Sequence, residues 1–406
     1  MNTSFGRVLA ALIVASGLPG AQETSTRSAL IEEARAEKQK NPPAEEKSGI
    51  EQALIVVKER RLLDKWRYGW HGLRPRVGAL VTGSGFAFGP EFLRTDIRGG
   101  DVSFRVTTQF STSRYQLYDT ELAFPRLADN HVFVSLGARH RNYPHMQYYG
   151  PGPDSKRTGR SSYRLEDNMF GFTVGVRPVR QVYMGVTGDL LQVNIGPGTH
   201  ERFVSTDRSY TEAQTPGIQR QTDFLQGSVF AAVDTRDVAG GPRSGTLLRA
   251  DLIYNKDTDL RMNTHRRLNM EAQQYIPFFN KRRVIALRGR SELTYKNPGQ
   301  QVPFYLQPVL GGSNDLRGFR PFRFHDDNLI LFNAEYRYEI FAGLDMAVFA
   351  DAGKVFHSKK QWNVRDMEGS YGIGMRFNAR NAVVMRVDAG FSHEGFMVWV
   401  KFNNIF

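Results

Sequence analysis

The sequence predicts an all-β protein, a transmembrane antiparallel β-barrel of about sixteen strands with a short helical N-terminal segment. From Val77 onward, apolar and polar residues alternate in segments that often reach about ten residues, whereas strands of soluble proteins usually have about five or six. Aromatic residues also gather at the ends of these segments, as Tyr336 and Tyr338 do. Long alternating segments with aromatic girdles are typical of outer-membrane barrels, which leave no unpaired edge in lipid.

The alternation is clearest in the last third of the chain. In residues 383–391, Val383, Met385 and Val387 share one face, while Arg386 and Asp388 share the other. A soluble antiparallel sheet with one wet face also alternates, so strand length and the aromatic girdles decide between the two. In a barrel the charged face points into the lumen, where Arg and acidic side chains pair across strands.

The connections between the predicted strands fall into two classes. Tight turns are predicted at residues 178–180, 280–282, 341–343 and 378–381, and long polar loops at 142–162, 196–224, 297–326 and 357–369. In outer-membrane barrels the short turns face the periplasm and the long loops face outside. Gly83 and Gly85 are predicted to divide the first long alternating segment after Val77 into the two strands of a hairpin.

Composition excludes several classes of site. The chain of 406 residues has Cys 0, so it has no disulfide, no thiol nucleophile and no thiolate zinc site. Its net charge is +13, but Arg alternates with acidic residues and forms no basic block, so no nucleic-acid partner is predicted. Histidines are scattered singly, and neither a metal nor a cofactor is predicted.

The first residues resemble an export signal. Arg7 precedes the apolar run 8–18, which is too short to span a bilayer, and small residues follow at 19–21. We therefore predict a signal peptide over residues 1–21 and a mature protein outside the cytoplasm.

Residues 22–76 have a different composition from the rest of the chain. Residues 28–40 are rich in Ala, Glu and Lys, and Ser48 with Glu51 forms a capping box for a second helix. This helical segment is predicted to lie at the periplasmic mouth or on the membrane interface, and the barrel is predicted to occupy residues 77–406. Two positions for the second helix stay open: on a membrane surface, or packed against or plugging the barrel.

A polar loop at residues 310–319 places one cation between apolar anchors and several glycines. Two strands later Asp351 lies on the predicted lumen face. An Arg317 side chain that reaches into the lumen would find Asp351 there, with Glu335 or Glu339 as a second partner. A buried charge requires such a partner.

Three motifs relate the chain to a known family. They are Arg317-Gly318-Phe319 in the loop, Phe349-Ala350-Asp351-Ala352-Gly353 on the later strand, and Asp234-Thr235-Arg236-Asp237 in a turn before Gly245-Thr246-Leu247. In their order and spacing the chain resembles the bacterial surface antigen superfamily of outer-membrane assembly and translocation barrels, the relatives of BamA, TamA and FhaC. Ser244 stands where the family has Arg, and the resemblance covers roughly residues 77–406.

The resemblance implies a sixteen-stranded barrel in the cell outer membrane, whose loop folds into the lumen. Arg317, Gly318, Phe319, Asp351 and Gly353 would form a loop lock. The first and last strands would meet weakly, and the barrel would insert or pass unfolded outer-membrane or secreted polypeptide. The family's periplasmic POTRA modules are not predicted in this chain, because residues 22–76 are too short and too helical for one.

The chain ends on an alternating strand in which Phe402 and Phe406 share a face. This ending resembles the C-terminal insertion signal that the cell's barrel-assembly machinery recognises in such proteins. Outer-membrane lipid is the other expected partner.

Two other functions remain as alternatives. One is a plugged or passive channel, or a lipid-related barrel, without protein-translocation activity. The other is an outer-membrane enzyme, for which His140 and His325-Asp326-Asp327 are the only suggestive positions. A solvated loop and a lumen-facing strand end explain these positions better than a catalytic site does. No Gly-x-Ser-x-Gly elbow is present either, so no enzyme is predicted.

Overall fold

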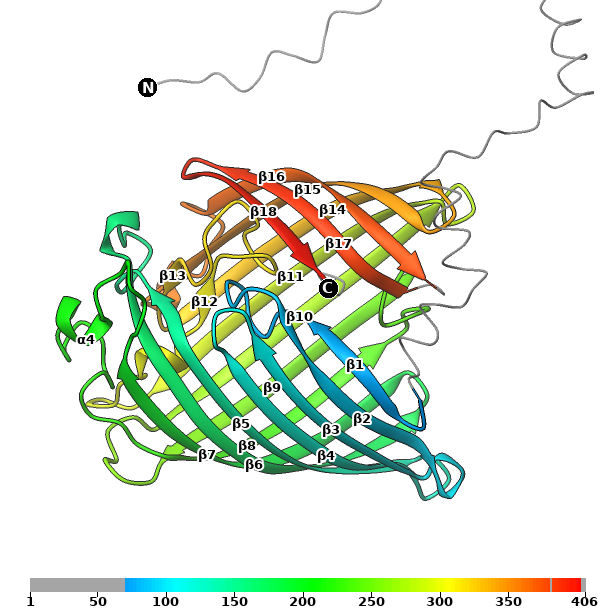
Figure 1. Cartoon of the computed structure of the whole chain (residues 1–406), viewed down its shortest axis with the longest axis horizontal. Helices are drawn as coiled ribbons and strands as arrows, with labels where there is room; N and C mark the ends of the chain where they lie inside the picture. The colour runs from blue at the N-terminus through cyan, green and yellow to red at the C-terminus, as the bar shows by residue number, and fades with distance from the viewer. Residues whose placement is uncertain (1–69, 380–381, 403–406) are drawn as a thin grey trace, which may run out of the picture. The chain divides into compact units, whose positions relative to one another are not determined.

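The computed structural model describes residues 70–379 and 382–402, and within them sixteen strands form one sheet in which neighbours pair in chain order. The pairs are antiparallel, and the sheet curves into a nearly closed barrel (Figure 1). The strands are β1 (Leu73–Gly78), β2 (Ala87–Ile97), β3 (Val102–Ser111), β4 (Gln116–Leu127), β5 (Val132–Tyr148), β6 (Ser161–Val179), β7 (Val182–Pro197), β8 (Phe224–Asp234), β9 (Gly245–Asp257), β10 (His265–Phe278), β11 (Arg283–Lys296), β14 (Asn328–Phe341), β15 (Leu344–Phe356), β16 (Glu368–Ala379), β17 (Ala382–Ser392) and β18 (Gly395–Lys401). The predicted fold class and strand number are confirmed.

The two faces of the strands have opposite chemistry. On β14, Phe332 and Tyr336 are exposed on the outside, whereas Asn333, Glu335 and Arg337 between them are buried on the inside. Because side chains alternate along a strand, an apolar-out and polar-in pattern gives the wall a lipid-compatible exterior. The barrel interior therefore contains paired charges in addition to separate buried apolar clusters.

The longest connections all lie at one end of the barrel, as predicted, although the short connections 112–115 and 393–394 share that end. The opposite end carries tight turns and one connection of intermediate length, residues 235–244. The long connections are residues 149–160, 198–223, 297–327 and 357–367. They carry the short elements β12 (Val309–Leu310), β13 (Phe324–His325), the helix α4 (Thr206–Ser209) and the 3-10 turns Arg157–Gly159, Phe304–Leu306 and Lys359–Gln361; a further 3-10 turn, Arg98–Gly100, joins β2 to β3. Within the described residues, no helix has the length and apolarity needed to cross a bilayer.

The barrel begins earlier than the predicted boundary at Val77. Strand β1 starts at Leu73 and pairs with β2, and the side chains of Arg74 and Arg76 both bind Glu91. The period-two spacing of these two Arg places both side chains in the lumen. Gly83 and Gly85, both with positive φ, lie in the turn between β1 and β2, as the hairpin prediction required. The predicted signal peptide, the helical segment up to residue 69 and Phe406 lie outside the described residues.

Loop 297–327, between β11 and β14, is anchored on the inner wall by an apolar cluster. Leu310, Leu316, Phe319 and Phe324 of the loop pack against buried residues of β14 and β15. The members from the strands are Leu329, Leu331 and Val355. Burial of such side chains contributes roughly 1.5–3 kcal/mol each. The loop is therefore held against the wall beside the last strands of the sheet.

Candidate functional site: a buried loop beside the free strand edges

Glycines allow loop 297–327 to fold tightly. Gly311 and Gly312 both have positive φ, and a Cβ on Gly311 would lie 2.5 Å from the backbone oxygen of Arg320. Any other residue at Gly311 would meet backbone atoms that cannot move aside. The tight fold presents the next residues of the loop to the inner faces of β14–β18.

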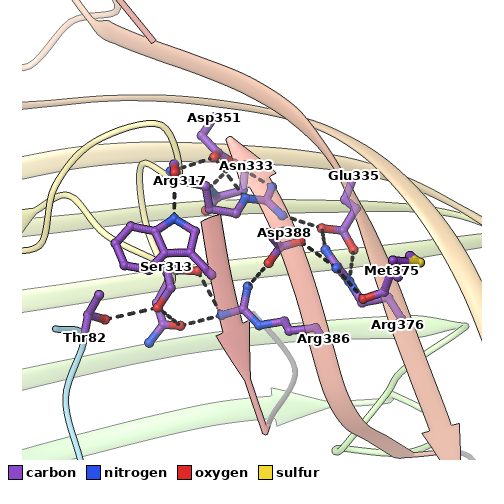
Figure 2. Close-up of polar contacts among 12 residues, drawn as sticks. Thr82, Ser313, Arg317, Asn333, Glu335, Asp351, Met375, Arg376, Arg386 and Asp388 are labelled. Carbon is purple, nitrogen blue, oxygen red and sulfur yellow. Dashed lines mark hydrogen bonds and ion pairs between the residues drawn. The ribbon is translucent and has the colours of Figure 1, made fainter. Parts of the chain in front are cut away.

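Arg317 is the centre of the contacts between the loop and the wall. Its side chain is fully buried; Nε donates to Asp351 Oδ2 at 3.0 Å and Nη2 to Asp351 Oδ1 at 2.7 Å (Figure 2). Nη1 donates to Glu335 Oε2 at 2.6 Å, and the guanidinium carbon lies 3.4 Å from the centroid of the Phe349 ring. A two-point pair with a carboxylate fixes both the charge and the orientation of the guanidinium group.

The ion pairs continue across β16 and β17 and return to the loop. Arg376 joins Glu335 to Asp388, with its Nη1 2.6 Å from Asp388 Oδ1. Arg386 also binds Asp388, and its Nη2 donates to the backbone oxygen of Ser313 at 2.9 Å. Figure 2 shows this network of buried charges, which links β14, β15, β16 and β17 to Ser313 and Arg317 of the loop. Removal of one member would leave another charge buried without its partner.

The loop also touches β17 so closely that only glycine fits on either side. A Cβ on Gly318 would lie 2.6 Å from the backbone of Phe391, and one on Gly390 would lie 2.4 Å from the backbone oxygen of Arg317. Ser392 Oγ donates to the backbone oxygen of Gly318 at 2.8 Å. These approaches place the loop backbone directly on β17.

The two ends of the sheet form a seam. Within the described residues no pairing joins β1 to β18, and these strands have 6 and 7 residues, whereas β6 has 19. Beside the seam lies a cavity of about 420 Å³, lined by β1, by the turn after it, by Lys401 and Phe402, and by the loop. The unpaired edges present backbone donors and acceptors to whatever occupies the seam.

The loop contacts both sides of this seam. On the C-terminal side, Trp399 Nε1 of β18 donates to the backbone oxygen of Arg317 at 2.7 Å. On the N-terminal side, Thr82 and Ser313 share a hydroxyl–hydroxyl hydrogen bond of 3.1 Å (Figure 2). The loop therefore bridges two edges that do not pair with each other.

The structure places the predicted lock residues as follows. Arg317 meets Asp351 and Glu335, Phe319 lies in the apolar cluster, and a Cβ on Gly353 would lie 3.1 Å from Leu310 of the loop. Glu339, the other suggested partner, is elsewhere: it lies near the short-turn end of β14, 3.8 Å from Arg243 Nη1. Glu335 and Glu339 both point into the lumen from β14, but Glu339 lies too far along the strand to reach Arg317.

Sequence reasoning missed most of the residues around the lock. They are Arg376, Arg386, Asp388, Gly390, Ser392 and Trp399, which come from the last three strands. Alternation placed Arg386 and Asp388 on the lumen face, but nothing in their spacing shows which loop they meet. Their contacts depend on closure of the barrel, which brings β16, β17 and β18 next to loop 297–327.

The predicted turn motif forms a compact polar turn between β8 and β9. Arg236 binds Asp234, with Nη2 2.8 Å from Oδ2. Asp237 accepts from the backbone N–H of Arg243 at 3.0 Å and from Lys281 Nζ at 3.1 Å. Partial burial acts to raise the pKa of Asp237, but these hydrogen bonds outweigh it and lower that pKa to about 2. This turn stabilises the end of the barrel where the short turns lie.

Phe402 follows β18 and lies edge-to-face against Phe86 with ring centroids 6.2 Å apart. Its ring therefore contacts the turn after β1, on the opposite side of the seam.

One group of potential metal ligands is not visible from sequence spacing. Asp326, Asp327 and His357 each offer a ligand atom, and these atoms lie within 4.8 Å of one another. Lys296 Nζ already lies 2.6 Å from Asp327 Oδ2. Because this cation compensates the carboxylate, the geometry is that of an ion-pair network at the loop end of the barrel.

Comparisons with known proteins point to one family. The sequence model of the Omp85 superfamily domain matches residues 97–391. Among solved structures, the chain is similar to BamA from Haemophilus ducreyi lacking POTRA domains 1–3, with a TM-score of 0.57, 14% identity, and coverage of 82% of this chain and 69% of that chain. It is also similar to CdiB from Escherichia coli, with a TM-score of 0.54, 13% identity, and coverage of 82% of this chain and 62% of that chain. Curated proteins give no sequence match.

Proposed function

Because the chain belongs to the Omp85 superfamily, whose barrels reside in the outer membrane, we propose that it inserts polypeptide into that membrane or passes polypeptide across it. The matched domain covers most of the barrel, and the family consists of assembly and transport proteins rather than enzymes. The solved structures that resemble the barrel share its fold at low identity, so the activity is supported by family membership and by the geometry of the seam.

The observation that carries the proposal is the seam between β1 and β18. An unpaired strand edge is a template for another strand, since its backbone groups are available for hydrogen bonds. A cavity lies beside this edge, and within the described residues its two sides are linked by the loop and by the Phe86–Phe402 ring contact, with no ladder of hydrogen bonds. An incoming strand would gain ladder hydrogen bonds at the seam without first breaking any between β1 and β18.

The loop lock would regulate this seam. Arg317 holds the loop to β14 and β15 through its carboxylate partners, while its backbone oxygen holds Trp399 of β18. Movement of the loop would release both edges together. In the locked state the loop would also obstruct the lumen, which separates this proposal from an open diffusion channel.

The proposed partners are unfolded outer-membrane or secreted polypeptide and outer-membrane lipid. The barrel-assembly machinery of the cell would act on the chain during its own biogenesis, through the alternating C-terminal residues up to Phe406. Residues 22–69 would supply a periplasmic or interfacial helix.

A disulfide across the seam tests the proposal. The Cβ of Phe402 lies 3.9 Å from the position of a Cβ on Gly78, a separation that suits a disulfide. The chain has Cys 0, so Gly78→Cys with Phe402→Cys introduces the only thiols. The full chain in liposomes is given a urea-unfolded eight-stranded outer-membrane protein, and folding of that probe is followed by its heat-modifiable migration. We expect oxidation to abolish the assisted folding and reduction to restore it.

The matched control joins two strands that already pair. Ala389 and Val398 face each other on β17 and β18, so their Cys variants form a cross-link that leaves the seam free. This control should keep its activity when oxidised, and each single-Cys variant should behave like the parent chain under both conditions. Equal activity of the seam-locked barrel in both redox states would contradict insertion through the seam. Large steady single-channel currents from the unmodified chain would instead support a passive channel.

A further inference from the structure

The loop between β15 and β16, residues 357–367, lies on the outside of the barrel. Trp362 Nε1 donates to Ser291 Oγ at 3.1 Å, and Lys359 Nζ lies 3.7 Å from the centroid of the Tyr295 ring. Ser291 and Tyr295 are on the outward face of β11, together with the exposed Leu287. This loop therefore covers part of the wall that faces lipid, whereas loop 297–327 lies within.

Beneath Trp362 the outer wall is hollowed. An apolar groove of about 510 Å³ crosses β8–β11 and β14, and its polar surface is very small. Its floor is made of small residues at neighbouring register positions on adjacent strands, Ala231, Ala250, Ala272 and Gly289. Larger side chains border it, among them Leu248, Phe332 and Trp362. The groove thus has the shape and polarity of a site for a hydrocarbon chain.

Cations and aromatic rings lie above the groove at the loop end of the same strands. In the sheet register Arg266 lies between Tyr254 and Tyr295, and its guanidinium carbon is 5.7 Å from the Tyr254 ring centroid. Lys359 lies over Tyr295, and Lys256 faces outward from the end of β9. Tyr, Trp and cationic side chains are the residues that meet lipid head groups.

On the outer face of strands β8–β11 and β14, no acidic side chain lies beside these cations, and the exposed Asp366 is in loop 357–367. The alternation of β8–β11 and β14 turns every Asp and Glu of those strands to the inside. Over the described residues 70–379 and 382–402, no ion pair involves Lys256, Arg266 or Lys359. The rim above the groove is therefore complementary to an anion.

The separation between the rim and the groove matches one acyl chain. Tyr295 and Gly289 are both on the outward face of β11, about 20 Å apart along the strand. With a strand tilt of about 45°, this distance corresponds to roughly 14 Å of depth, close to half of the hydrocarbon core. An acyl chain whose head group lies at the cationic rim would therefore end at the small residues of the groove floor.

We propose that this groove binds one acyl chain of a lipid in the outer leaflet, whose phosphorylated head group lies against Arg266, Lys359 and Lys256. The site is on the opposite face of the wall from the loop lock and does not depend on the proposed polypeptide activity. Trp362 closes the upper edge of the groove, and loop 357–367 is positioned by the same side chains that line it.

Native mass spectrometry of the full chain in detergent tests this proposal, with dipalmitoyl phosphatidic acid as the probe. One molecule should be retained, and dipalmitoylglycerol, which lacks the phosphate, should be retained much less. Gly289→Leu fills the groove, since a Cβ there meets only the Phe332 ring at 3.6 Å, and should weaken retention at least tenfold. Arg266→Gln and Lys359→Gln should each weaken it about fivefold.

Two matched variants control for general effects on the outer wall. Gly227→Leu adds the same side chain on β8 outside the groove, and Arg283→Gln removes an outward cation at the opposite end of β11. Retention should be unchanged in both. Equal losses in these controls, no loss in Gly289→Leu, or binding of inorganic phosphate alone with the same affinity would each overturn the proposal.

Discussion

The long strands β5–β7 and the edge strands β1 and β18 belong to one sheet but are stabilised in different ways. Strands β5, β6 and β7 have 17, 19 and 16 residues and pair with neighbours on both sides. Strands β1 and β18 have 6 and 7 residues, and within residues 70–379 and 382–402 each pairs on one side only. Backbone ladders hold the long wall, whereas side-chain contacts from loop 297–327 hold the edges.

The two regions also use buried charge differently. In the long wall, Arg141 pairs with Asp167 on the neighbouring strand, with Nε 2.8 Å from Oδ1. In loop 297–327, Arg317 reaches from the loop to β14 and β15, so its ion pairs are separate from the ladder hydrogen bonds between strands. The same interaction therefore joins paired strands in one region and holds a loop to the wall in the other.

The largest expected effect comes from Arg317→Ala. We expect it to lower the free energy of unfolding by about 3–5 kcal/mol, because Asp351 would keep a buried charge without its main partner. Arg317→Lys should lose less, since it retains the charge but not the two-point geometry. Urea unfolding followed by heat-modifiable migration measures both changes.

Arg141→Ala is the matched variant that tests the comparison. It also leaves a buried carboxylate, Asp167, and should destabilise the barrel, but planar-bilayer currents should stay small. Arg317→Ala should give large currents, because the loop is released. Arg320→Ala, three positions along the same loop, should change neither quantity. Similar currents from all three variants would remove the distinction between the two regions.

The second prediction concerns the close approach of the loop to β17. Gly318→Ala would place a Cβ 2.6 Å from the backbone of Phe391, so the loop must move away from the strand. We expect a loss of about 1–3 kcal/mol in unfolding free energy and increased bilayer conductance. Gly369→Ala is the control, because no atom lies within 4 Å of a Cβ there. A Gly318→Ala barrel as stable and as closed as the Gly369→Ala barrel would show that the contact is not required.

The third prediction isolates the hydrogen bond that ties β18 to the loop. Trp399→Phe keeps an aromatic ring but removes the donor to the Arg317 backbone oxygen, and should cost about 1 kcal/mol. Trp362→Phe removes a comparable bond on the outer wall, to Ser291. Only Trp399→Phe should increase cross-linking between Cys residues at the seam and an added unfolded strand. Equal cross-linking in the two variants would mean that this bond does not hold the edge.

The barrel was predictable because period-two alternation survives in every long strand. The strand number, the polar lumen and the order of short turns and long loops all follow from side-chain direction, which is a local property. The start of the barrel was predicted at Val77, whereas β1 begins at Leu73. The structure pairs Arg74 and Arg76 with Glu91, a contact that only strand pairing reveals.

The surroundings of the loop were only partly predictable. The spacing of charged positions on the lumen faces pointed to Asp351 and to either Glu335 or Glu339, and only the structure shows that Glu335 is the second partner. The contacts of Trp399, Gly390 and Ser392 with the loop depend on where β17 and β18 lie once the sixteen-stranded sheet has curved into a barrel. The groove on the outer wall was invisible for the same reason: its floor comes from residues on four different strands.

The smallest expected effect belongs to the turn between β8 and β9, where the Gly240 backbone oxygen accepts from the N–H of Val383 on β17 at 3.0 Å. The pKa of Asp237, lowered to about 2, means that its ionised form is favoured in the folded barrel. The contribution of this carboxylate to the free energy of unfolding is complete above the ordinary carboxylate pKa of about 4 and is lost as the pH falls toward 2. Because the group is partly exposed, we expect a loss of only about 1 kcal/mol. Asp237→Asn should remove this part of the pH dependence, measured by urea unfolding between these two pH values. Currents through the barrel should not change in this variant, since the turn stabilises the wall and does not touch the loop; an opened channel would show that the two regions are coupled.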